Sequence, residues 1–308
     1  MKTCFLFPGQ GAQYPGMARD LWEESPGVKD LFATASKIIG KDLKGLLFDG
    51  NEEDLKTTEN TQPAVTLANL SSAVYLSEKG VNPSGCAGFS LGEYSALWQA
   101  GILTTEDLFT IVKIRGEIME AAASKLESPN GNPGMAAVLG LTYDETSAAV
   151  ENLKGEVYVA NYNSPTQVVL AGTFEGLEKA DKLTEKAGAA RYVRLKVSGP
   201  FHTPLMGEAR DNFEKELRSF DFSDPKLTIF SNVDGEKILS GDKAKDLCVR
   251  QIVSAVLWVA EENSILKEGY ESILETGPGK VLRGLWRSFT KEIACLPAGT
   301  IEDIKNLG

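Results

Sequence analysis

The sequence contains a single histidine, His202, and only four cysteines among its 308 residues. The cysteines, Cys4, Cys86, Cys248 and Cys295, are far apart and form no C-x-x-C pair. A zinc site of the Cys/His type therefore lacks ligands, and we expect no bound metal. Cys4 and Cys86 lie in apolar runs, which is typical of buried thiols in a reducing cytosol.

Positively charged side chains are also scarce, since 32 lysines and arginines stand against 43 aspartates and glutamates and give a net charge of −11. This balance argues against broad, non-specific binding to nucleic acids or anionic membranes, although a local basic patch is compatible with it. No apolar run approaches the roughly 20 residues of a membrane span, and the run at Cys4–Phe7 is too short for a signal peptide. We therefore expect a cytoplasmic protein.

What the sequence does contain is a serine between two glycines, in the stretch Gly88-Phe89-Ser90-Leu91-Gly92. Small residues before it indicate a buried strand, and residues 93–98 after it indicate a helix. Such a strand, turn and helix form the nucleophile elbow of serine-dependent enzymes, in which a side chain at either glycine position would clash with the flanking elements. A glycine-rich surface turn with an incidental serine is the alternative, and so short a motif does not decide between them.

Strands and helices alternate along the chain in the manner of a parallel α/β sheet. Apolar runs at Thr3–Phe7, Val81–Gly88 and Ile273–Thr276 predict strands, and segments with helical periodicity lie between them. Ligands of such sheets bind at the carboxyl ends of the strands, where the loop Pro8–Gln13 and the serine motif would both lie. Taken alone, that loop is either a backbone that faces a ligand or a plain strand-to-helix turn.

A breaker-rich linker at 128–134 opens a separate pattern. Residues 135–197 predict strand, helix, two strands, helix and strand, which is the βαββαβ order of a ferredoxin-like unit. We therefore predict an α/β fold with two domains. The large domain is discontinuous, at residues 1–127 and 197–308, and has an α/β-hydrolase-like core with a parallel sheet. The small, ferredoxin-like domain is inserted at residues 128–196.

If Ser90 is a nucleophile it needs a base, and His202 is the one candidate of the usual kind. Pro200 and Pro204 restrict the backbone around it and so the direction of the ring. The order serine then histidine agrees with α/β-hydrolase-like enzymes. An imidazole with a purely structural role is the alternative. Since no aspartate stands out as a third member, we predict a Ser–His dyad, with a backbone carbonyl to orient the ring.

Arg115 falls on the apolar stripe of a helix predicted over about 105–124, between Val112 and Met119. A guanidinium keeps its charge, so burial of this side chain would require an anionic partner. That partner is either an internal carboxylate or the carboxylate of a substrate, whereas an arginine that extends out to solvent needs neither.

Several short motifs occur together and in order. They are Phe-Pro-Gly-Gln-Gly at 7–11, Gly-Phe-Ser-Leu-Gly-Glu at 88–93, Arg115, Ala-Asn-Tyr-Asn-Ser-Pro at 160–165, Pro-Phe-His at 200–202, Val-Arg-Gln at 249–251 and Gly-Pro-Gly-Lys-Val-Leu at 277–282. Each is weak alone, but the ordered set closely resembles the malonyl-CoA:acyl carrier protein transacylases of type II fatty acid synthesis, over essentially the whole chain. The resemblance implies transfer of a malonyl group from malonyl-CoA, as substrate, to acyl carrier protein, with no bound cofactor.

The resemblance also implies a role for each residue of the reaction centre. Ser90 would attack the malonyl thioester, and His202 would take its proton and return it to the leaving thiol. The backbone carbonyl of Gln251 would steady the imidazole ring. Backbone N–H groups of Gln10 and Leu91 would form the oxyanion hole, which gives the glycine-rich first loop a purpose.

Four further residues would bind the acyl group. Arg115 would hold the malonyl carboxylate with both arms of its guanidinium, and Met119 and Asn161 would contact the substrate. Phe201 matches the form associated with malonyl rather than bulkier methylmalonyl units. One residue departs from the family pattern: Phe89 stands where the family usually has histidine. Phenylalanine donates no hydrogen bond, but it leaves the dyad intact, so we predict that turnover survives.

The partner implied by the resemblance, acyl carrier protein, is acidic, so binding by this acidic chain requires a local basic surface. Two groups of basic residues are candidates: Lys182, Lys186, Arg191, Arg194 and Lys196 in the small domain, and Lys280, Arg283 and Arg287 near the C-terminus. Ordinary solvated faces are the alternative for both groups. Nothing in the sequence indicates an obligate dimer, and we expect a monomer.

Three other functions stay open on the sequence alone. They are a malonyl transferase for polyketide synthesis, a CoA thioesterase in which water takes the acyl group, and a non-catalytic module that binds a carrier or CoA. A general esterase has no use for a buried cation beside the acyl pocket, and retention of both Ser90 and His202 argues against a non-catalytic module. A chain of this length favours fatty acid synthesis.

Overall fold

The structure is a computed structural model and describes residues 1–307. Its larger part is built on a five-stranded sheet of order β7-β2-β1-β8-β9, in which every neighbouring pair is parallel. The strands are β1 (Thr3–Phe7), β2 (Gly85–Gly88), β7 (Thr228–Ile229), β8 (Ser272–Glu275) and β9 (Cys295–Pro297). The predicted parallel sheet is confirmed, with β9 as an additional, unpredicted edge strand.

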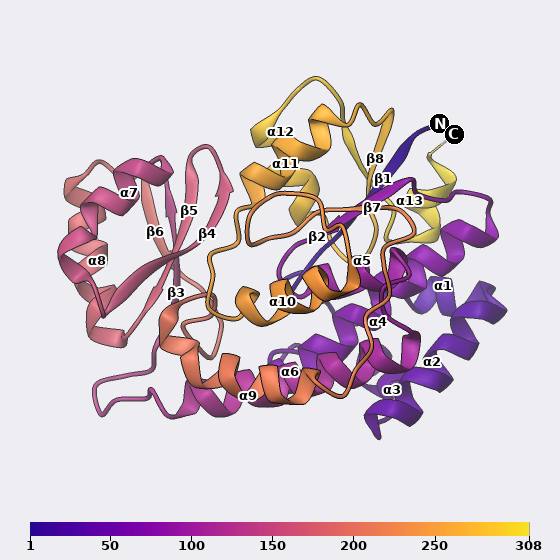
Figure 1. Ribbon diagram of the computed structural model, residues 1–308, viewed down its shortest axis with the longest axis horizontal. Coiled ribbons are helices and arrows are strands. Elements are labelled where there is room, and N and C mark those ends of the chain that lie inside the picture. The colour runs from indigo at the N-terminus through magenta and orange to yellow at the C-terminus, as the bar shows by residue number, and fades with distance from the viewer. Residues whose placement is uncertain (308) are drawn as a thin grey trace.

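Helices cover both faces of this sheet because its strands alternate between two apolar cores (Figure 1). Along β1, Phe5 and Phe7 belong to one core, and Cys4 and Leu6 belong to the other. The second core is completed by α11 (Trp258–Lys267) and α12 (Val281–Phe289). The helices that contribute buried residues to the first core are α1 (Arg19–Glu24), α2 (Pro26–Ile39), α3 (Leu43–Phe48), α4 (Thr58–Glu78), α5 (Gly92–Gln99), α6 (Thr105–Ser124), α9 (Gly207–Leu217), α10 (Gly241–Gln251) and α13 (Ile301–Lys305).

The long helix α6 begins and ends where the sequence predicts. The side chain of Thr104 caps it by accepting a hydrogen bond from the Asp107 N–H (3.1 Å), and acidic residues in the first turn favour the helix dipole. The helix α4, which packs against α6, starts at Thr58. Pro63 therefore lies inside α4 and not at its opening.

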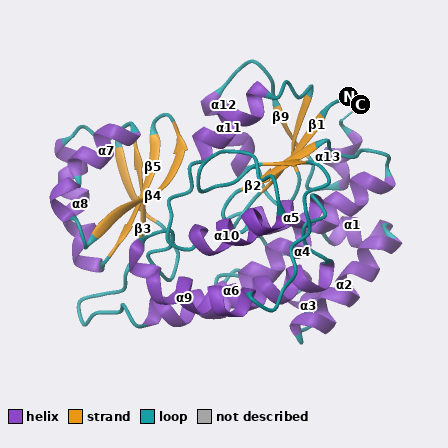
Figure 2. Ribbon diagram, viewed as in Figure 1, coloured by secondary structure: helices purple, strands orange, loops and turns teal. Residues whose placement is uncertain are grey.

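A second, four-stranded sheet is formed by β3 (Gly134–Leu139), β4 (Val157–Ser164), β5 (Gln167–Gly172) and β6 (Arg191–Arg194). Its strand order is β4-β5-β3-β6, and every neighbouring pair is antiparallel. The helices α7 (Tyr143–Ala149) and α8 (Phe174–Lys186) cover one face (Figure 2). The predicted ferredoxin-like unit is confirmed, whereas the exact domain boundaries at 128 and 196 stay a prediction.

The uncovered face of the small sheet turns toward the larger part of the molecule. Backbone hydrogen bonds join the two parts, because the Tyr162 N–H donates to the Val256 carbonyl (2.9 Å) and the Val256 N–H donates to the Ala160 carbonyl (2.9 Å). The space at this junction is bounded by the carboxyl end of β2 on one side and by β4 on the other. Across residues 1–307, no helix is both long enough and apolar enough to cross a membrane.

Candidate active site

Ser90 lies in the tight turn between β2 and α5 and has a φ of 51°. A serine rarely adopts this left-handed conformation, which costs about 1–3 kcal/mol and persists only where the surroundings enforce it. The flanking glycines permit the turn. A Cβ atom at Gly88 would overlap the backbone of Gly92, and one at Gly92 would overlap the Phe7 carbonyl. The turn therefore has the geometry of a nucleophile elbow.

His202 lies directly beside this serine, with Ser90 Oγ 2.7 Å from His202 Nε2. The other ring nitrogen, Nδ1, is 2.9 Å from the backbone carbonyl of Gln251. Because a carbonyl only accepts, Nδ1 carries the proton and Nε2 accepts the serine hydroxyl. Burial and the charge of Arg115 lower the pKa of His202 to about 4, so the ring is neutral at physiological pH.

Backbone strain is concentrated at the same pair. Within residues 1–307, three residues other than glycine have a positive φ, and two of them are Ser90 and His202, at 51° and 62°. Strained residues of this kind cluster at functional sites, where the surrounding structure holds them in place.

Two backbone N–H groups near Ser90, those of Gln10 and Leu91, have no acceptor within residues 1–307. The loop that carries Gln10 packs on the elbow at Gly9, where a Cβ atom would overlap the Phe89 carbonyl. This contact is possible only for glycine. It brings the loop after β1 against the turn after β2, so the two free donors come from neighbouring strands of one sheet.

Arg115 is buried, at 1% exposure, and no carboxylate within residues 1–307 forms an ion pair with it. Its guanidinium donates to Gln62 Oε1 (3.0 Å) and to Gln251 Oε1 (3.1 Å), while its Nε has no partner in the described chain. The ring of Tyr94 lies 5.2 Å from the guanidinium carbon. The internal salt bridge and the extension to solvent, both open on the sequence, are therefore wrong. Within residues 1–307, the hydrogen-bond partners of this buried cation are neutral amides alone.

Glu93 is the carboxyl group that could have neutralised this arginine. It is buried, and burial raises its pKa to about 8 although the Gln251 side chain, the Asn232 N–H and the charge of Arg115 oppose the shift. Burial thus disfavours the ionised form of Glu93, which is the form that could neutralise Arg115. The Gln251 amide also donates to the Glu93 carboxyl and to the Ser90 carbonyl (3.1 Å). One side chain thus connects Arg115 to the serine turn.

Ser90, His202 and Arg115 line one cavity of about 460 Å³ between the two sheets. Every other predicted site residue except Gln251 lines the same cavity: Gln10, Leu91, Met119, Asn161 and Phe201. Gln251 lies just behind it and contacts both Arg115 and His202. The cavity therefore brings together a serine hydrogen-bonded to a histidine, two free N–H donors and a cation without an ion-pair partner in residues 1–307.

Comparison with known proteins identifies the family of this chain. Residues 4–297 match the family described as "Acyl transferase domain". The chain is also 36% identical to a malonyl CoA-acyl carrier protein transacylase of Bacillus subtilis (strain 168), over 99% of this chain and 95% of that protein. The chain belongs to the malonyl-CoA:acyl carrier protein transacylase family. It is an acyltransferase, as the resemblance implied.

Solved structures of this family agree with the fold over its whole length. An acyl carrier protein S-malonyltransferase from Vibrio cholerae O1 is 37% identical with a TM-score of 0.94 and covers 100% of both chains. A malonyl-transacylase solved with its type II PKS acyl-carrier protein is 35% identical with a TM-score of 0.94, over 99% of this chain and 98% of that one.

Phe89, the residue that departs from the family pattern, lines the cavity and is half-buried. Its ring packs edge-to-face on Trp258 with 5.4 Å between centroids. Trp258 in turn donates its indole N–H to Glu262 Oε1 (2.9 Å). No hydrogen bond of Ser90 or His202 within residues 1–307 involves the Phe89 side chain. In this member of the family, an apolar wall therefore stands beside the serine.

Four buried polar residues around the elbow were not predicted from the sequence: Gln62, Glu93, Asn232 and Glu261. Glu93 directly follows the serine motif, and this adjacency was an available signal. The other three come from α4, from the segment after β7 and from α11. No local pattern marks them, because their role depends on which segments the fold brings together.

The first predicted basic group does not share one surface. Lys182 and Lys186 lie on α8, which packs on the sheet face opposite the cavity, and the Arg194 guanidinium lies over the ring of Phe174. Of the five residues, Lys196 lines the cavity.

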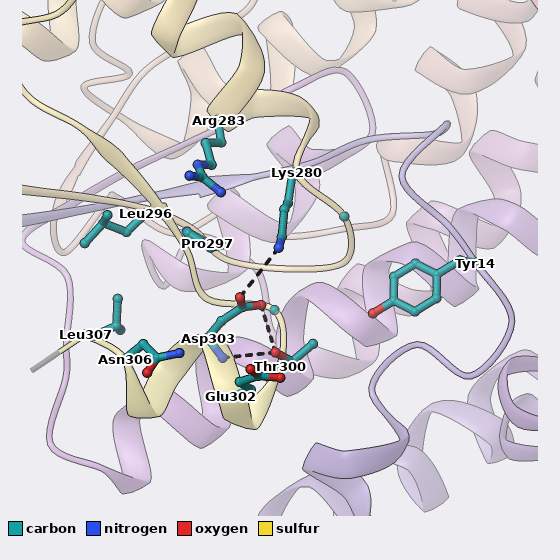
Figure 3. A pocket seen from close by; sticks show the side chains of 12 residues that line it. Tyr14, Lys280, Arg283, Leu296, Pro297, Thr300, Glu302, Asp303, Asn306 and Leu307 are labelled. Atoms are coloured by element: carbon teal, nitrogen blue, oxygen red, sulfur yellow. Dashed lines mark hydrogen bonds and ion pairs between the residues drawn. The ribbon is translucent and has the colours of Figure 1, made fainter.

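A larger cavity, of about 810 Å³, lies on the other side of the loop before α12 and holds none of the predicted catalytic residues. Figure 3 shows Lys280 directed toward Asp303, at 4.0 Å, and Arg283 extending from α12. This cavity is lined by two acidic residues, Glu302 and Asp303, and by two basic residues, Lys280 and Arg283. No group of three or more candidate metal ligands occurs in residues 1–307.

Proposed function

We propose that the chain transfers a malonyl group from malonyl-CoA to the thiol of acyl carrier protein through a malonyl-Ser90 intermediate. The observation that carries this proposal is Arg115, a buried guanidinium with no carboxylate partner, in the same cavity as Ser90 and His202. Malonyl is an acyl group with a free carboxylate at its far end. That carboxylate would supply the anion that Arg115 lacks while the thioester carbonyl lies at the serine.

In the first half-reaction, Ser90 Oγ attacks the thioester carbon as its proton passes to His202 Nε2. The Gln10 and Leu91 N–H groups would stabilise the oxyanion that forms. The carbon–sulfur bond then breaks, and His202 returns the proton to the leaving CoA thiolate. The Gln251 carbonyl keeps the Nδ1 proton in place throughout, so the ring can act first as base and then as acid.

In the second half-reaction, the carrier thiol takes the place of CoA. His202 accepts the thiol proton, the sulfur attacks the malonyl ester, and the proton returns to Ser90 Oγ as the ester bond breaks. Acyl transfer to sulfur then competes with hydrolysis by water. Phe89, Val281 and Leu285 line the cavity and provide an apolar wall beside the ester, which disfavours water there.

Acyl selectivity in this proposal has two sources. Arg115 favours acyl groups that carry a carboxylate, and Phe201 limits their size. Phe201 is buried at 5% exposure in the cavity wall, and its ring packs near Gly199, where a Cβ atom would lie 3.0 Å from it. A branched acyl group would have to displace this ring.

We further propose that the acidic carrier docks at the cavity mouth and not on the outer face of the small sheet. Leu195 and Val281, at 36% and 46% exposure, lie on opposite sides of the cavity. Two basic residues, Lys56 and Lys196, line the same cavity. An apolar centre with a basic rim is suited to an acidic protein that delivers a long thiol arm.

Incubation with malonyl-CoA followed by intact-protein mass spectrometry tests the proposed function. We expect an adduct of about 86 Da, the mass that malonylation adds, which is absent in Ser90→Ala and is discharged by carrier protein in its thiol form. An adduct that water removes as fast as carrier does would favour a thioesterase. No adduct on Ser90 would contradict the proposal.

A further inference from the structure

The strand β7, which pairs with β2, ends before it reaches the serine turn and leaves that turn without a neighbouring strand. β7 pairs with β2 only through Thr228 opposite Gly85 and Ile229 opposite Cys86. Beyond that point β2 continues to Gly88 and the turn at Ser90. On this side of β2, the Gly88 carbonyl and the Ser90 N–H would be left without strand partners, in a buried region where unpaired backbone groups are costly.

The side chain of Asn232 takes both of these bonds. Its Oδ1 accepts from the Ser90 N–H (2.6 Å), and its Nδ2 donates to the Gly88 carbonyl (2.7 Å). If the register of Ile229 opposite Cys86 is continued, Asn232 falls opposite Phe89. In a parallel ladder, the residue at that position would bond the same two groups with its own backbone. The amide side chain therefore replaces one missing residue of β7.

The backbone of Asn232 is used elsewhere, which explains why a side chain is needed. Its N–H donates to Glu93 Oε1 (3.3 Å), and its carbonyl accepts from the Leu257 N–H (2.8 Å). The amide orientation is fixed, because Ser90 offers only a donor and Gly88 only an acceptor. The second Nδ2 hydrogen goes to Glu261 Oε2 (2.7 Å). Asn232 is fully buried and every one of its polar atoms is bonded.

We propose that Asn232 is a positioning residue, which holds the strained turn of Ser90 so that the serine hydroxyl meets His202 and the Leu91 N–H stays free for the oxyanion. The inference rests on the proposed function. Because the Ser90 N–H is bound to Asn232, it is not available as an oxyanion donor. Loss of the amide would free both ends of the turn, allow Ser90 to leave its positive φ and misalign the hydroxyl, whereas the direct hydrogen bonds of Arg115 to Gln62 and Gln251 would remain.

The variant Asn232→Asp gives a readout that a merely structural role would not produce. A protonated aspartic acid can accept from Ser90 and donate to Gly88, whereas an ionised one repels the Gly88 carbonyl. The groups that face this position are Glu93, Glu261, Asp234 and, through Glu93, the charge of Arg115. Burial and the three acidic neighbours would raise the pKa of the introduced carboxyl, and Arg115 would oppose this in part.

Between pH 5.5 and 9.5, we expect the single-turnover rate of Ser90 malonylation by N232D to start within about fivefold of wild type and then to fall by up to about tenfold per pH unit above the pKa of the introduced carboxyl. The KM for malonyl-CoA should change little. Asn263→Asp is the matched control, since it also removes an amide donor from a backbone carbonyl (Val259, 2.7 Å) but lies outside the elbow. Its pH profile should match wild type. If the rate of N232D per folded molecule depended on pH in the same way as the rate of wild type, the proposal would be overturned.

Hydrogen exchange supplies a second measurement that needs no turnover. In Asn232→Ala, the peptide that contains Phe89–Leu91 should exchange faster than in wild type, while peptides of α4 and β1 stay protected. Unchanged exchange there would overturn the proposal, as would a failure of all Asn232 variants to fold, since Asn232 would then be a folding residue. If wild-type protein gives no malonyl adduct, the proposed function fails, and the exchange result still decides the bracing of the turn.

Discussion

Replacement of Arg115 by alanine separates the recognition of the acyl group from the chemistry at the serine. The guanidinium is the buried positive charge of the cavity, which Lys56 and Lys196 also line, and its present partners are two neutral amides. In Arg115→Ala, the carboxylate of malonyl-CoA would enter the cavity without a counter-ion. Acetyl-CoA has no carboxylate and would be unaffected by the loss.

The size of the effect follows from the buried geometry. Two unit charges at about 4 Å attract by about 4 kcal/mol at an effective dielectric constant of about 20. Water that enters the enlarged cavity screens part of this, so we expect a loss of about 100- to 1,000-fold in kcat/KM for malonyl-CoA. Arg115→Lys keeps the charge but not the fork, and should lose about tenfold. Arg210→Ala, at an exposed arginine paired with Asp211 on α9, is the matched control and should change neither value.

The assay compares kcat/KM for malonyl-CoA and acetyl-CoA at a fixed carrier concentration, over a range of pH. The ratio of the two values should fall toward one in Arg115→Ala. The acid limb should also move to higher pH, because Arg115 helps to lower the pKa of His202 and its removal lets that pKa rise. A variant that kept the malonyl preference of wild type would refute the assignment of Arg115.

Three further predictions concern stability, the departing residue and the partner. The free energy of unfolding should fall as pH rises from about 5 to 8, by about 1 kcal/mol per pH unit for each of two carboxyl groups. Burial raises the folded-state pKa of Glu93 to about 8 and that of Glu262 to about 9. In the unfolded chain both groups ionise near their ordinary pKa values. Scanning calorimetry should show a flatter profile for Glu262→Gln, and a flat wild-type profile would contradict this. Phe89→His should leave kcat within about threefold of wild type, since the dyad does not use this side chain, and a large gain would show that the natural chain lacks a catalytic group. Lys196→Glu should raise KM for the carrier but not for malonyl-CoA, with Lys186→Glu as the control; equal effects of the two reversals would count against docking at the cavity mouth.

Much of the site could be predicted because its parts are local in sequence. The elbow is a continuous stretch, and its two glycines are required by the contacts of a turn only five residues long. Arg115 was identified as misplaced on its own helix, since a charge on an apolar stripe is visible from helical periodicity alone. His202 needed no spatial information, because the chain offers no other histidine.

The sequence alone left open which groups contact a given side chain in the fold. The choice between an internal carboxylate and a substrate for Arg115 depended on what lies within hydrogen-bond distance across helices, and the sequence is compatible with either. Glu93 stands close by in the fold, and only the structure shows that burial raises the pKa of its carboxyl group. The predicted basic group was divided for a similar reason, since Lys182 and Lys186 lie on α8, on one face of the small sheet, whereas Lys196 follows β6 and lines the cavity.

The serine, its glycines, the histidine and an arginine on an apolar stripe are each a feature of one segment, so reading the chain was enough to find them. The folded structure was needed to show that no carboxylate within residues 1–307 forms an ion pair with this arginine and that Asn232 completes the sheet beside the serine. Both depend on the ends of strands and helices that are far apart in the chain. Such contacts arise from packing, and packing has no signature in a single segment.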